Sequence, residues 1–234
     1  MRVLAIDTST PVLSVAVVDE SRVLGEWTTN LNKNHSIGLM EGISQLLYEV
    51  KVSPEELELI ACARGPGSYT GVRIGVATAK SMAWAIGIPV VGVSSLYAVA
   101  ANAAGFPGGV VPLFDARRGQ VYTAYYKSLG MQVTEKVPER IVLLRDWVSD
   151  MADHAEEEDI LFVGEDVQLH RSTIEEVLGS RAQFAPPAFN HPRAAHIAWL
   201  GVKQAADAET SHQLTPEYLQ LAEAEANWLA KQQK

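Results

Sequence analysis

The feature that most constrains the fold is a plan that occurs twice along the chain. Residues 3–18 read as an apolar strand, an aspartate, a turn and a second strand, and residues 111–126 repeat that order in register, so Asp7 and Asp115 stand 108 positions apart. Two aspartates that close equivalent hairpins predict two related lobes facing a cleft. The seam is expected at 104–109, where three glycines and a proline interrupt helix and strand alike. The alternative is a chance match, because this composition is common in β-hairpins.

Length and composition favour an α/β protein with a full core. The 234 residues suit one large domain or two small lobes, and apolar strands alternate with helical stretches. We expect residues 1–106 to form the first lobe and residues 107–234 the second. A net charge of −9 argues against nucleic acid being held by this chain itself, because phosphate binding relies on clustered Lys and Arg.

No targeting or membrane segment is expected from the sequence. Asp7 interrupts the apolar start of the chain after four apolar residues, so no signal-peptide core forms there, and no apolar run reaches membrane-spanning length. The lone Cys62 lies in the apolar run 59–63 and is interpreted as a buried strand thiol, which fits a reducing cytoplasm.

A glycine-rich loop joins that run to the following helix. Its residues are Gly65, Pro66, Gly67, Ser68, Tyr69, Thr70, Gly71 and Arg73. The glycines allow positive φ and a close approach to another group, and the N–H groups that open the helix would face an anion. However, a Walker loop requires Lys and then Ser or Thr after its last glycine, where Val72 and Arg73 stand here, and no dinucleotide fingerprint fits. A turn used for packing is therefore the favoured interpretation.

Small residues recur at every fourth position of the helix that follows the loop. The set is Gly71, Gly75, Ala79, Ala83 and Gly87. A glycine inside a helix costs roughly 1 kcal/mol relative to alanine, so close approach of another backbone is the expected compensation at Gly75. Two interpretations stay open: a core helix buried nearly all round, or a helix at a subunit interface.

The remaining hydrophobic patterns complete an alternating α/β order. Further strands are predicted at 23–28, 59–63, 89–93 and 160–164. Helices are predicted at 36–50, at 70–86, from Ser94 or Ser95 onward and at 192–207 with Asn190 or His191 as the cap. From Pro216 a tail, residues 217–221, leads into a short helix that ends near Lys231.

Four segments together resemble one protein family. They are residues 4–9, 65–75, 114–122 and 216–219. On these segments the whole chain resembles the bacterial TsaB (YeaZ) family, and the glycine loop is the most specific of them. The resemblance implies a two-lobe fold of the actin, Hsp70 and sugar-kinase superfamily, with a duplicated mixed sheet and flanking helices. It also implies a cytoplasmic role in making threonylcarbamoyladenosine beside the tRNA anticodon, as a non-catalytic subunit that pairs with the paralogous transferase TsaD and is joined by the ATPase TsaE.

The residues themselves agree with a non-catalytic role. Kinases and ATPases of the superfamily hold Mg-phosphate where Asp7 and Asp115 stand, but Pro11 and Arg117 degrade the turns that should follow. We interpret these turns as vestigial phosphate-site positions: Asp7, Thr8, Ser9, Asp115, Arg117 and Gly119. The family pattern has an arginine where this chain has Gln220, which argues against an anion contact by the tail.

No metal and no cofactor are expected on this chain alone. A site on one helix face requires two histidines at i and i+4, whereas Leu39 stands four places after His35. The resemblance implies that ATP and Mg²⁺ are used through the partners, and that tRNA is contacted only through them.

The leading hypothesis is a scaffold whose helices at 36–50 and 70–86 present apolar and small-residue surface to TsaD, or to a second copy of the chain when TsaD is absent. The predicted interface residues are Ser36, Leu39, Met40, Ile43, Leu47, Gly71, Gly75, Ala79, Met82 and Ala83. The enzymatic alternative is an ATP-dependent kinase or ATPase that uses Asp7 and Asp115 around Mg-ATP. Peptidase activity is a third class, disfavoured because residues 92–96 lack the final glycine of a nucleophile elbow.

Overall fold

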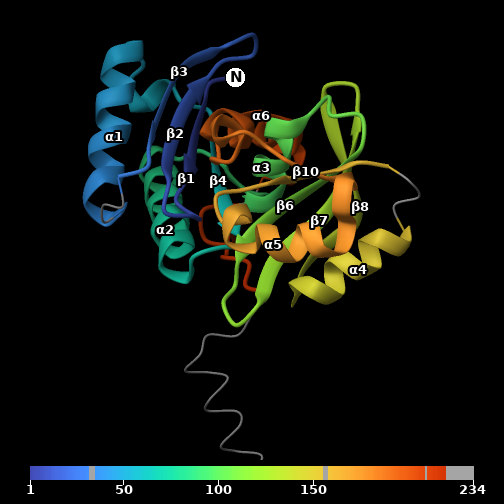
Figure 1. The fold of residues 1–234 in the computed structure, drawn as a ribbon. Helices are drawn as coiled ribbons and strands as arrows, with labels where there is room; N and C mark the ends of the chain where they lie inside the picture. Colours follow the sequence, from blue (N-terminus) through green and yellow to red (C-terminus); the bar gives the residue numbers. More distant parts are fainter. Residues whose placement is uncertain (32–34, 155–157, 209, 220–234) are drawn as a thin grey trace, which may run out of the picture.

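The strands of the protein form two five-stranded sheets in the computed structural model, which describes residues 1–31, 35–154, 158–208 and 210–219. The first sheet contains β1 (Val3–Asp7), β2 (Leu13–Val18), β3 (Val23–Thr29), β4 (Leu59–Gly65) and β5 (Val90–Ser94). The second contains β6 (Gly109–Asp115), β7 (Gln120–Leu129), β8 (Gln132–Leu143), β9 (Ile160–Val163) and β10 (Ala182–Phe184). Figure 1 shows the two sheets side by side.

The two sheets share one topology. The strand order is β3-β2-β1-β4-β5 in the first sheet and, read in the matching direction, β8-β7-β6-β9-β10 in the second. In both sheets the leading strand pairs antiparallel with the next strand and parallel with the fourth. Asp7 and Asp115 end the two leading strands. The duplicated two-lobe fold predicted from the repeated plan is therefore confirmed.

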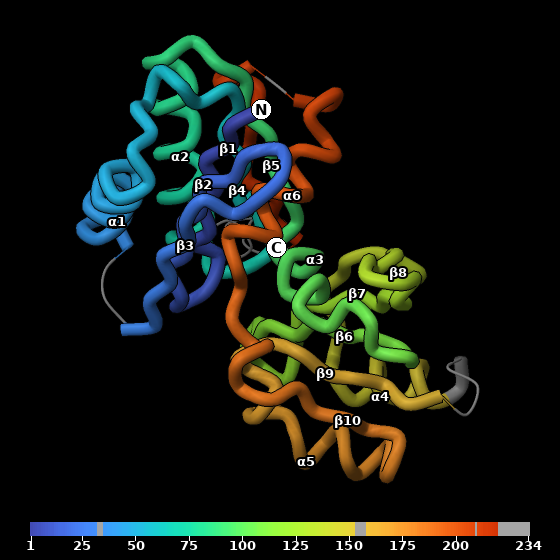
Figure 2. Tube along the Cα trace, turned by 90° about the horizontal axis from the view of Figure 1, so that it is seen from above, coloured from blue at the N-terminus to red at the C-terminus, as the bar shows by residue number. Residues whose placement is uncertain are grey.

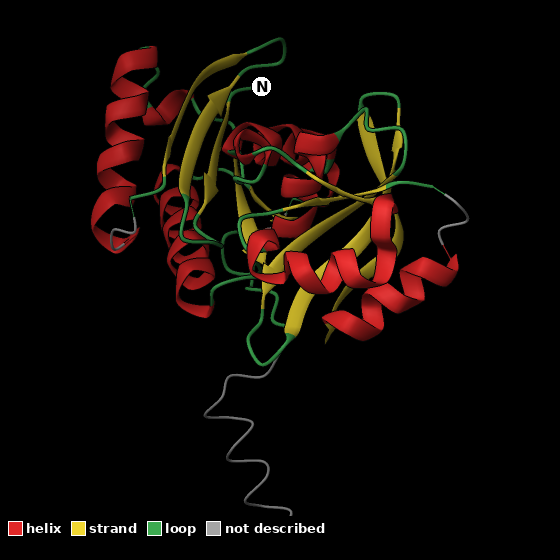
Figure 3. Ribbon diagram, in the orientation of Figure 1, coloured by secondary structure: helices red, strands yellow, loops and turns green. Residues whose placement is uncertain are grey.

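Helices cover both sheets in layers, as Figure 3 shows in red against yellow. The outer face of the first sheet carries α1 (His35–Val50) and α2 (Tyr69–Ile86), and that of the second carries α4 (Leu144–His154) and α5 (Val167–Leu178). Between the sheets lie α3 (Ser95–Ala100) and α6 (Ala194–Lys203) (Figure 2). Short 3-10 helices span Pro54–Glu56, Ala101–Ala103, Gly179–Arg181, Pro187–Phe189 and Ala205–Asp207.

The leading strand β1 shows why the strands read as continuous apolar runs. Leu4 and Ile6 belong to the core under α1 and α2, whereas Val3 and Ala5 belong to the core under α6. Because both faces of the sheet are covered, the strand needs no polar alternation. Cys62 on β4 is free and fully buried, which confirms its interpretation as a strand thiol.

Each of the two inner helices packs on the sheet of the other lobe. The expected division at residue 106 separates the strands, because β1–β5 precede it and β6–β10 follow it. However, Ile197 and Ala198 of α6 pack into the core of the first sheet, while Leu96 and Val99 of α3 pack into that of the second. Each sheet is thus completed by a helix from the other half of the sequence.

Helix α6 is shorter than the 192–207 predicted, and its predicted caps, Asn190 and His191, are wrong. Its N-cap residue is Arg193, whose side chain makes no capping hydrogen bond. Instead Ser14 Oγ and Glu26 Oε1 accept the first two helical N–H groups at 2.9 and 3.0 Å. The cap comes from strands of the first sheet, so the local sequence does not reveal it.

Other elements follow the expected bounds closely, and Ser94 caps α3 as predicted. Strands β8 and β10 and helices α4 and α5 were not expected from the hydrophobic pattern. The short helix expected after the tail, ending near Lys231, lies outside the described residues, as does Gln220. None of the described helices is both long and apolar enough to cross a bilayer.

Candidate functional site

The glycine-rich loop between β4 and α2 packs onto the turn that follows β1. The Ser68 N–H donates to Ser9 O, and Thr8 Oγ1 donates to Gly71 O, both at 2.7 Å. A Cβ on Gly67 would lie 2.3 Å from Ser9 O, and one on Gly71 would lie 2.0 Å from Thr8 O. Only glycine permits these approaches. The favoured interpretation of the loop as a packing turn is therefore confirmed.

Asp7, at the end of β1, is wholly buried, and only one of its two carboxylate oxygens has hydrogen-bond partners among the described residues. Its Oδ1 accepts hydrogen bonds from the Ser9 N–H at 2.8 Å and from Ser9 Oγ at 2.7 Å, whereas Oδ2 has no partner among the described residues. Burial raises the pKa of Asp7 to about 6, and the Ser9 hydrogen bonds and the charge of His35 oppose the rise only in part. Thr8 and Ser9 are each 1% exposed, so the chain itself fills the turn in which the superfamily holds phosphate.

Asp115 occupies the equivalent place in the second sheet, but its surroundings differ. Its side chain is 29% exposed, and its Oδ1 lies 3.0 Å from His170 Nε2. Its backbone N–H donates to Asp166 Oδ2 at 2.8 Å. In the turn that follows, Arg117 has a φ of 67° and Gly119 a φ of 74°. The duplicated plan thus ends in two chemically unlike sites, one sealed and one accessible to solvent.

A C-terminal strap, residues 210–219, returns from α6 to the first lobe and lies against the glycine loop. Lys80 Nζ donates to Leu214 O at 2.7 Å, and the Glu217 N–H donates to Arg64 O at the same distance. A Cβ on Gly65 would lie 2.4 Å from Glu217 O. Hydrophobic periodicity did not reveal this segment, because it is held by backbone hydrogen bonds and by one buried side chain, Leu214.

Two tyrosines lock the strap to the first turn of α2. The rings of Tyr69 and Tyr218 stack with centroids 5.0 Å apart. Arg73 Nη1 donates to Tyr69 Oη at 2.7 Å, and its guanidinium lies 5.2 Å from the centre of the same ring. The exposed positions Ser68 and Thr70 flank this contact. The loop residues Tyr69 and Arg73 therefore hold the returning chain.

The small-residue stripe of α2 faces the chain's own first sheet, so the prediction that it faces a partner is wrong. A Cβ on Gly75 would lie 2.5 Å from Thr8 Oγ1, and Ala79 and Ala83 are fully buried in the core that contains Ile6. The glycines let α2 sit close to the backbone of β1 and its turn. Seven predicted interface residues are in the core: Leu39, Ile43, Leu47, Gly71, Gly75, Ala79 and Ala83.

Helix α2 is also not buried all round, and other apolar side chains cover the solvent side of the helix pair. Ser36 and Met40 of the predicted set are exposed, and Met82 is partly buried. We define the outer helix face by its large exposed apolar residues: Ile37, Met40, Tyr48 and Trp84, with exposed fractions of 74%, 47%, 79% and 70%. Ile37, Tyr48 and Trp84 lie on the side of their helix away from its buried residues, and Met40 borders those of α1, so helical periodicity could have identified them. Large apolar side chains exposed on two neighbouring helices are consistent with a docking surface.

Three histidines of the described chain, His35, His170 and His191, each have a ring nitrogen within 3.0 Å of an oxygen of the fold. His35 Nε2 lies 2.8 Å from Thr10 O, and His191 Nδ1 lies 2.9 Å from Glu165 Oε1. Asn30 Nδ2 also donates to Glu165 Oε1, at 2.6 Å, which joins the two lobes. Among the described residues, no three His, Cys, Asp or Glu side chains form a group that could hold a metal ion. The expectation that the chain carries no metal stays a prediction.

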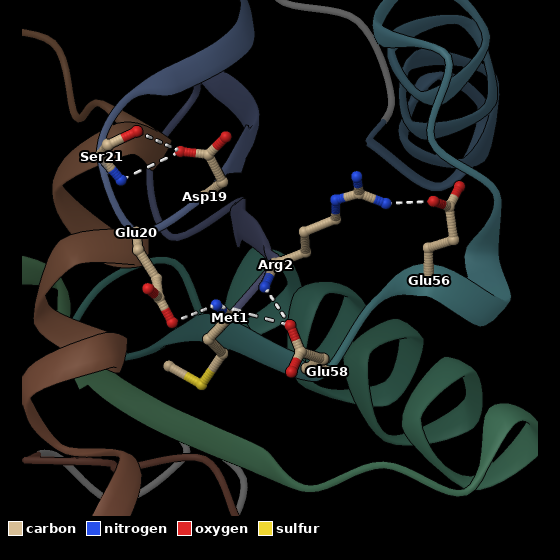
Figure 4. Close-up of polar contacts among 7 residues, drawn as sticks. All are labelled: Met1, Arg2, Asp19, Glu20, Ser21, Glu56 and Glu58. Atoms are coloured by element: carbon tan, nitrogen blue, oxygen red, sulfur yellow. Dashed lines mark hydrogen bonds and ion pairs between the residues drawn. The ribbon is translucent and has the colours of Figure 1, made fainter.

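A shallow hollow of about 560 Å³ surrounds the amino terminus, at the opposite end of β1 from Asp7 (Figure 4). The Met1 ammonium lies 2.7 Å from Glu20 Oε1 and 3.5 Å from Glu58 Oε2, and the Arg2 N–H donates to Glu58 Oε2 at 2.7 Å. The Arg2 side chain pairs with Glu56. Because these charges pair with one another, the cluster joins the ends of elements and presents no free ligand set among the described residues.

Comparisons with known proteins agree with this geometry. The family model described as TsaD, tRNA N6-adenosine threonylcarbamoyltransferase, matches residues 22–228. The tRNA threonylcarbamoyladenosine biosynthesis protein TsaB of Bacillus subtilis is 45% identical over 99% of this chain and 100% of its own length. The structure of YeaZ from Pseudomonas aeruginosa superposes with a TM-score of 0.79 at 26% identity, covering 93% of this chain and 99% of that one.

A more distant likeness concerns the fold alone. The ROK hexokinase of Thermus thermophilus superposes with a TM-score of 0.51 at 14% identity, over 87% of this chain and 100% of that one. The predicted actin, Hsp70 and sugar-kinase fold class is thereby confirmed, while the sealed turn beside Asp7 gives the kinase alternative no added support.

Proposed function

This chain belongs to the TsaB family of tRNA threonylcarbamoyladenosine biosynthesis proteins, and on that basis we propose that it is a non-catalytic scaffold subunit of the complex that adds threonylcarbamoyl to tRNA adenosine next to the anticodon. Its partner is TsaD, with TsaE joining the pair. The outer helix face is the observation that carries the proposal, because four large apolar side chains are exposed there on adjacent helices. A role in tRNA modification places the chain in the cytoplasm.

The filled turn beside Asp7 supports the non-catalytic part of the proposal. A phosphate or Mg²⁺ ion at that position would have to displace Gly67, Ser68 and Gly71, which are held there by the contacts described above. ATP and Mg²⁺ are accordingly used through the partners, and this chain alone binds no cofactor. Because this chain has a net charge of −9, tRNA is contacted through the partners as well.

The partner-binding surface consists of solvent-facing side chains and excludes the buried glycine stripe. In the absence of TsaD the same face pairs with a second copy of the chain, because an exposed apolar surface of this kind is covered most simply by its own equivalent. TsaD and the second copy therefore compete for one surface. Adding TsaD should convert a homodimer to a heterodimer.

Light scattering coupled to gel filtration tests this proposal. The chain and TsaD, mixed at equal concentration, should elute as one species with the mass of the pair. Trp84→Glu should abolish this species, because the substitution places a charge in the apolar contact. Leu169→Glu is the matched control, since Leu169 is also 70% exposed but belongs to α5, which covers the second sheet. Far-UV circular dichroism verifies that both variants are folded.

Two outcomes would refute the scaffold. One is a mixture of the unaltered chain with TsaD that stays as two separate species. The other is Leu169→Glu weakening the complex as much as Trp84→Glu. Calorimetry with Mg-ATP tests the non-catalytic part, because binding by the isolated chain that is lost in Asp7→Asn would instead support the kinase alternative.

A further inference from the structure

We propose that a cavity between α1 and β3 binds small organic cations with an apolar body, of the arylalkylammonium class. The cavity has a volume of about 420 Å³, within the range typical of ligand pockets. Its lining residues come mainly from α1, from β3 and from the segments that flank them. Figures 1 and 3 show α1 next to β3, the terminal strand of the first sheet. Of the outer helix face that carries the scaffold role, only Ile37 also lines this cavity, so the inference goes beyond the proposed function.

The walls of the cavity are apolar, and one of them is a fixed indole. Leu13, Leu31 and Ile37 line it together with Trp27, which is 38% exposed. A Cβ on Gly42 would lie only 2.5 Å from Cζ3 of Trp27, so the indole packs directly on the backbone of α1. The ring therefore presents a held surface of the kind that attracts organic cations most strongly.

Two polar groups at this cavity lack partners within the described chain. Thr29 Oγ1 is buried and makes no hydrogen bond, and Glu41 has neither a hydrogen bond nor an ion pair. Their polar neighbours are engaged, because His35 Nε2 contacts Thr10 O and Gln45 donates to Glu49 Oε1 at 3.0 Å. A buried hydroxyl without a partner requires an explanation, and a bound ligand supplies one.

The charge of the cavity selects the ligand class. Among the residues that the structure describes, no Lys or Arg lines it and neither α1 nor β3 contains one, so Glu41 has no Lys or Arg partner among them. An anion would be repelled, and a purely apolar ligand would leave Glu41 and Thr29 without a contact. A cation on an apolar body contacts Glu41 with its charge and Trp27 with its body, and an N–H of the cation is a donor for Thr29 Oγ1.

Nuclear magnetic resonance on the full chain tests the site. Titration with 2-phenylethylammonium should shift the indole N–H signal of Trp27, and 2-phenylethanol, which has the same ring without charge, should bind about five-fold more weakly. Glu41→Gln should remove this difference. Glu55→Gln, which deletes one exposed negative charge of the same lobe outside the cavity, should preserve it.

Each contrary result would overturn the assignment. These results are no binding of the ammonium, equal binding of ammonium and alcohol, or an equal loss in Glu41→Gln and Glu55→Gln. Nα-acetyl-lysine methylamide separates a side-chain ligand from an arylalkylammonium: the proposal requires that it bind more weakly than 2-phenylethylammonium, and the reverse order would replace the small-molecule assignment by a peptide one. None of these results alters the TsaD mixing experiment.

Discussion

Replacing Asp7 by asparagine should change how the stability of this protein depends on pH. Asp7 is fully buried, its Oδ1 accepts two hydrogen bonds from Ser9, and its Oδ2 has no partner among the described residues. An asparagine retains an oxygen for the Ser9 hydrogen bonds and cannot ionise. Comparison of the two proteins therefore isolates the cost of a buried carboxylate.

The magnitude follows from the shift in pKa. Burial raises the pKa of Asp7 from 3.8 to about 6, so the native state holds its proton more tightly than the unfolded state. The stability that this proton contributes is present below the unfolded pKa and is lost as the pH rises through about 6. A shift of about two units corresponds to about 3 kcal/mol. Because the unfolded carboxyl is already more than half ionised at pH 4, the asparagine variant should thus gain about 2 kcal/mol relative to the unaltered protein between pH 4 and pH 8.

Urea unfolding followed by circular dichroism at pH 4, 5, 6, 7 and 8 measures this difference. Other titrating groups contribute equally to both proteins and cancel. The buried amide N–H of asparagine also lacks a partner, which costs about 1–3 kcal/mol at every pH and displaces the curve without changing its slope. A difference that stays flat within 1 kcal/mol, or that falls with rising pH, would refute the reasoning.

Two further predictions concern buried positions. Gly75→Ala should lower the free energy of unfolding by about 1–3 kcal/mol, because the new Cβ would lie 2.5 Å from Thr8 Oγ1, which is held by a hydrogen bond to Gly71 O. Light scattering should show an unchanged mass. A changed mass with full stability would contradict the core position. Burial raises the pKa of Cys62 to about 12, so a thiol-specific chromogenic reagent should react only as urea unfolds the chain; prompt labelling of the native protein would disprove the burial.

The hydrophobic pattern determined much of the architecture. Strands β1, β2, β4 and β5 of the first sheet are apolar runs covered on both faces, so their positions could be read from composition alone, and the repeat around Asp7 and Asp115 predicted the second sheet. The loop at 65–71 was recognisable as a packing turn because its glycines lack the lysine of a phosphate-binding loop. These features are set by residues that lie close together in the sequence, so they can be predicted from the sequence.

Tertiary structure decided which surfaces meet. Periodicity shows that α2 has a bare stripe at Gly75 and Ala79, but a stripe of small residues suits a neighbouring sheet as well as a partner, and only the position of Thr8 shows that the sheet is its own. The strap at 210–219 is likewise held by groups more than 130 positions away, such as Lys80. Contacts between distant segments depend on the path that the chain takes in three dimensions. A local pattern of side chains does not specify that path.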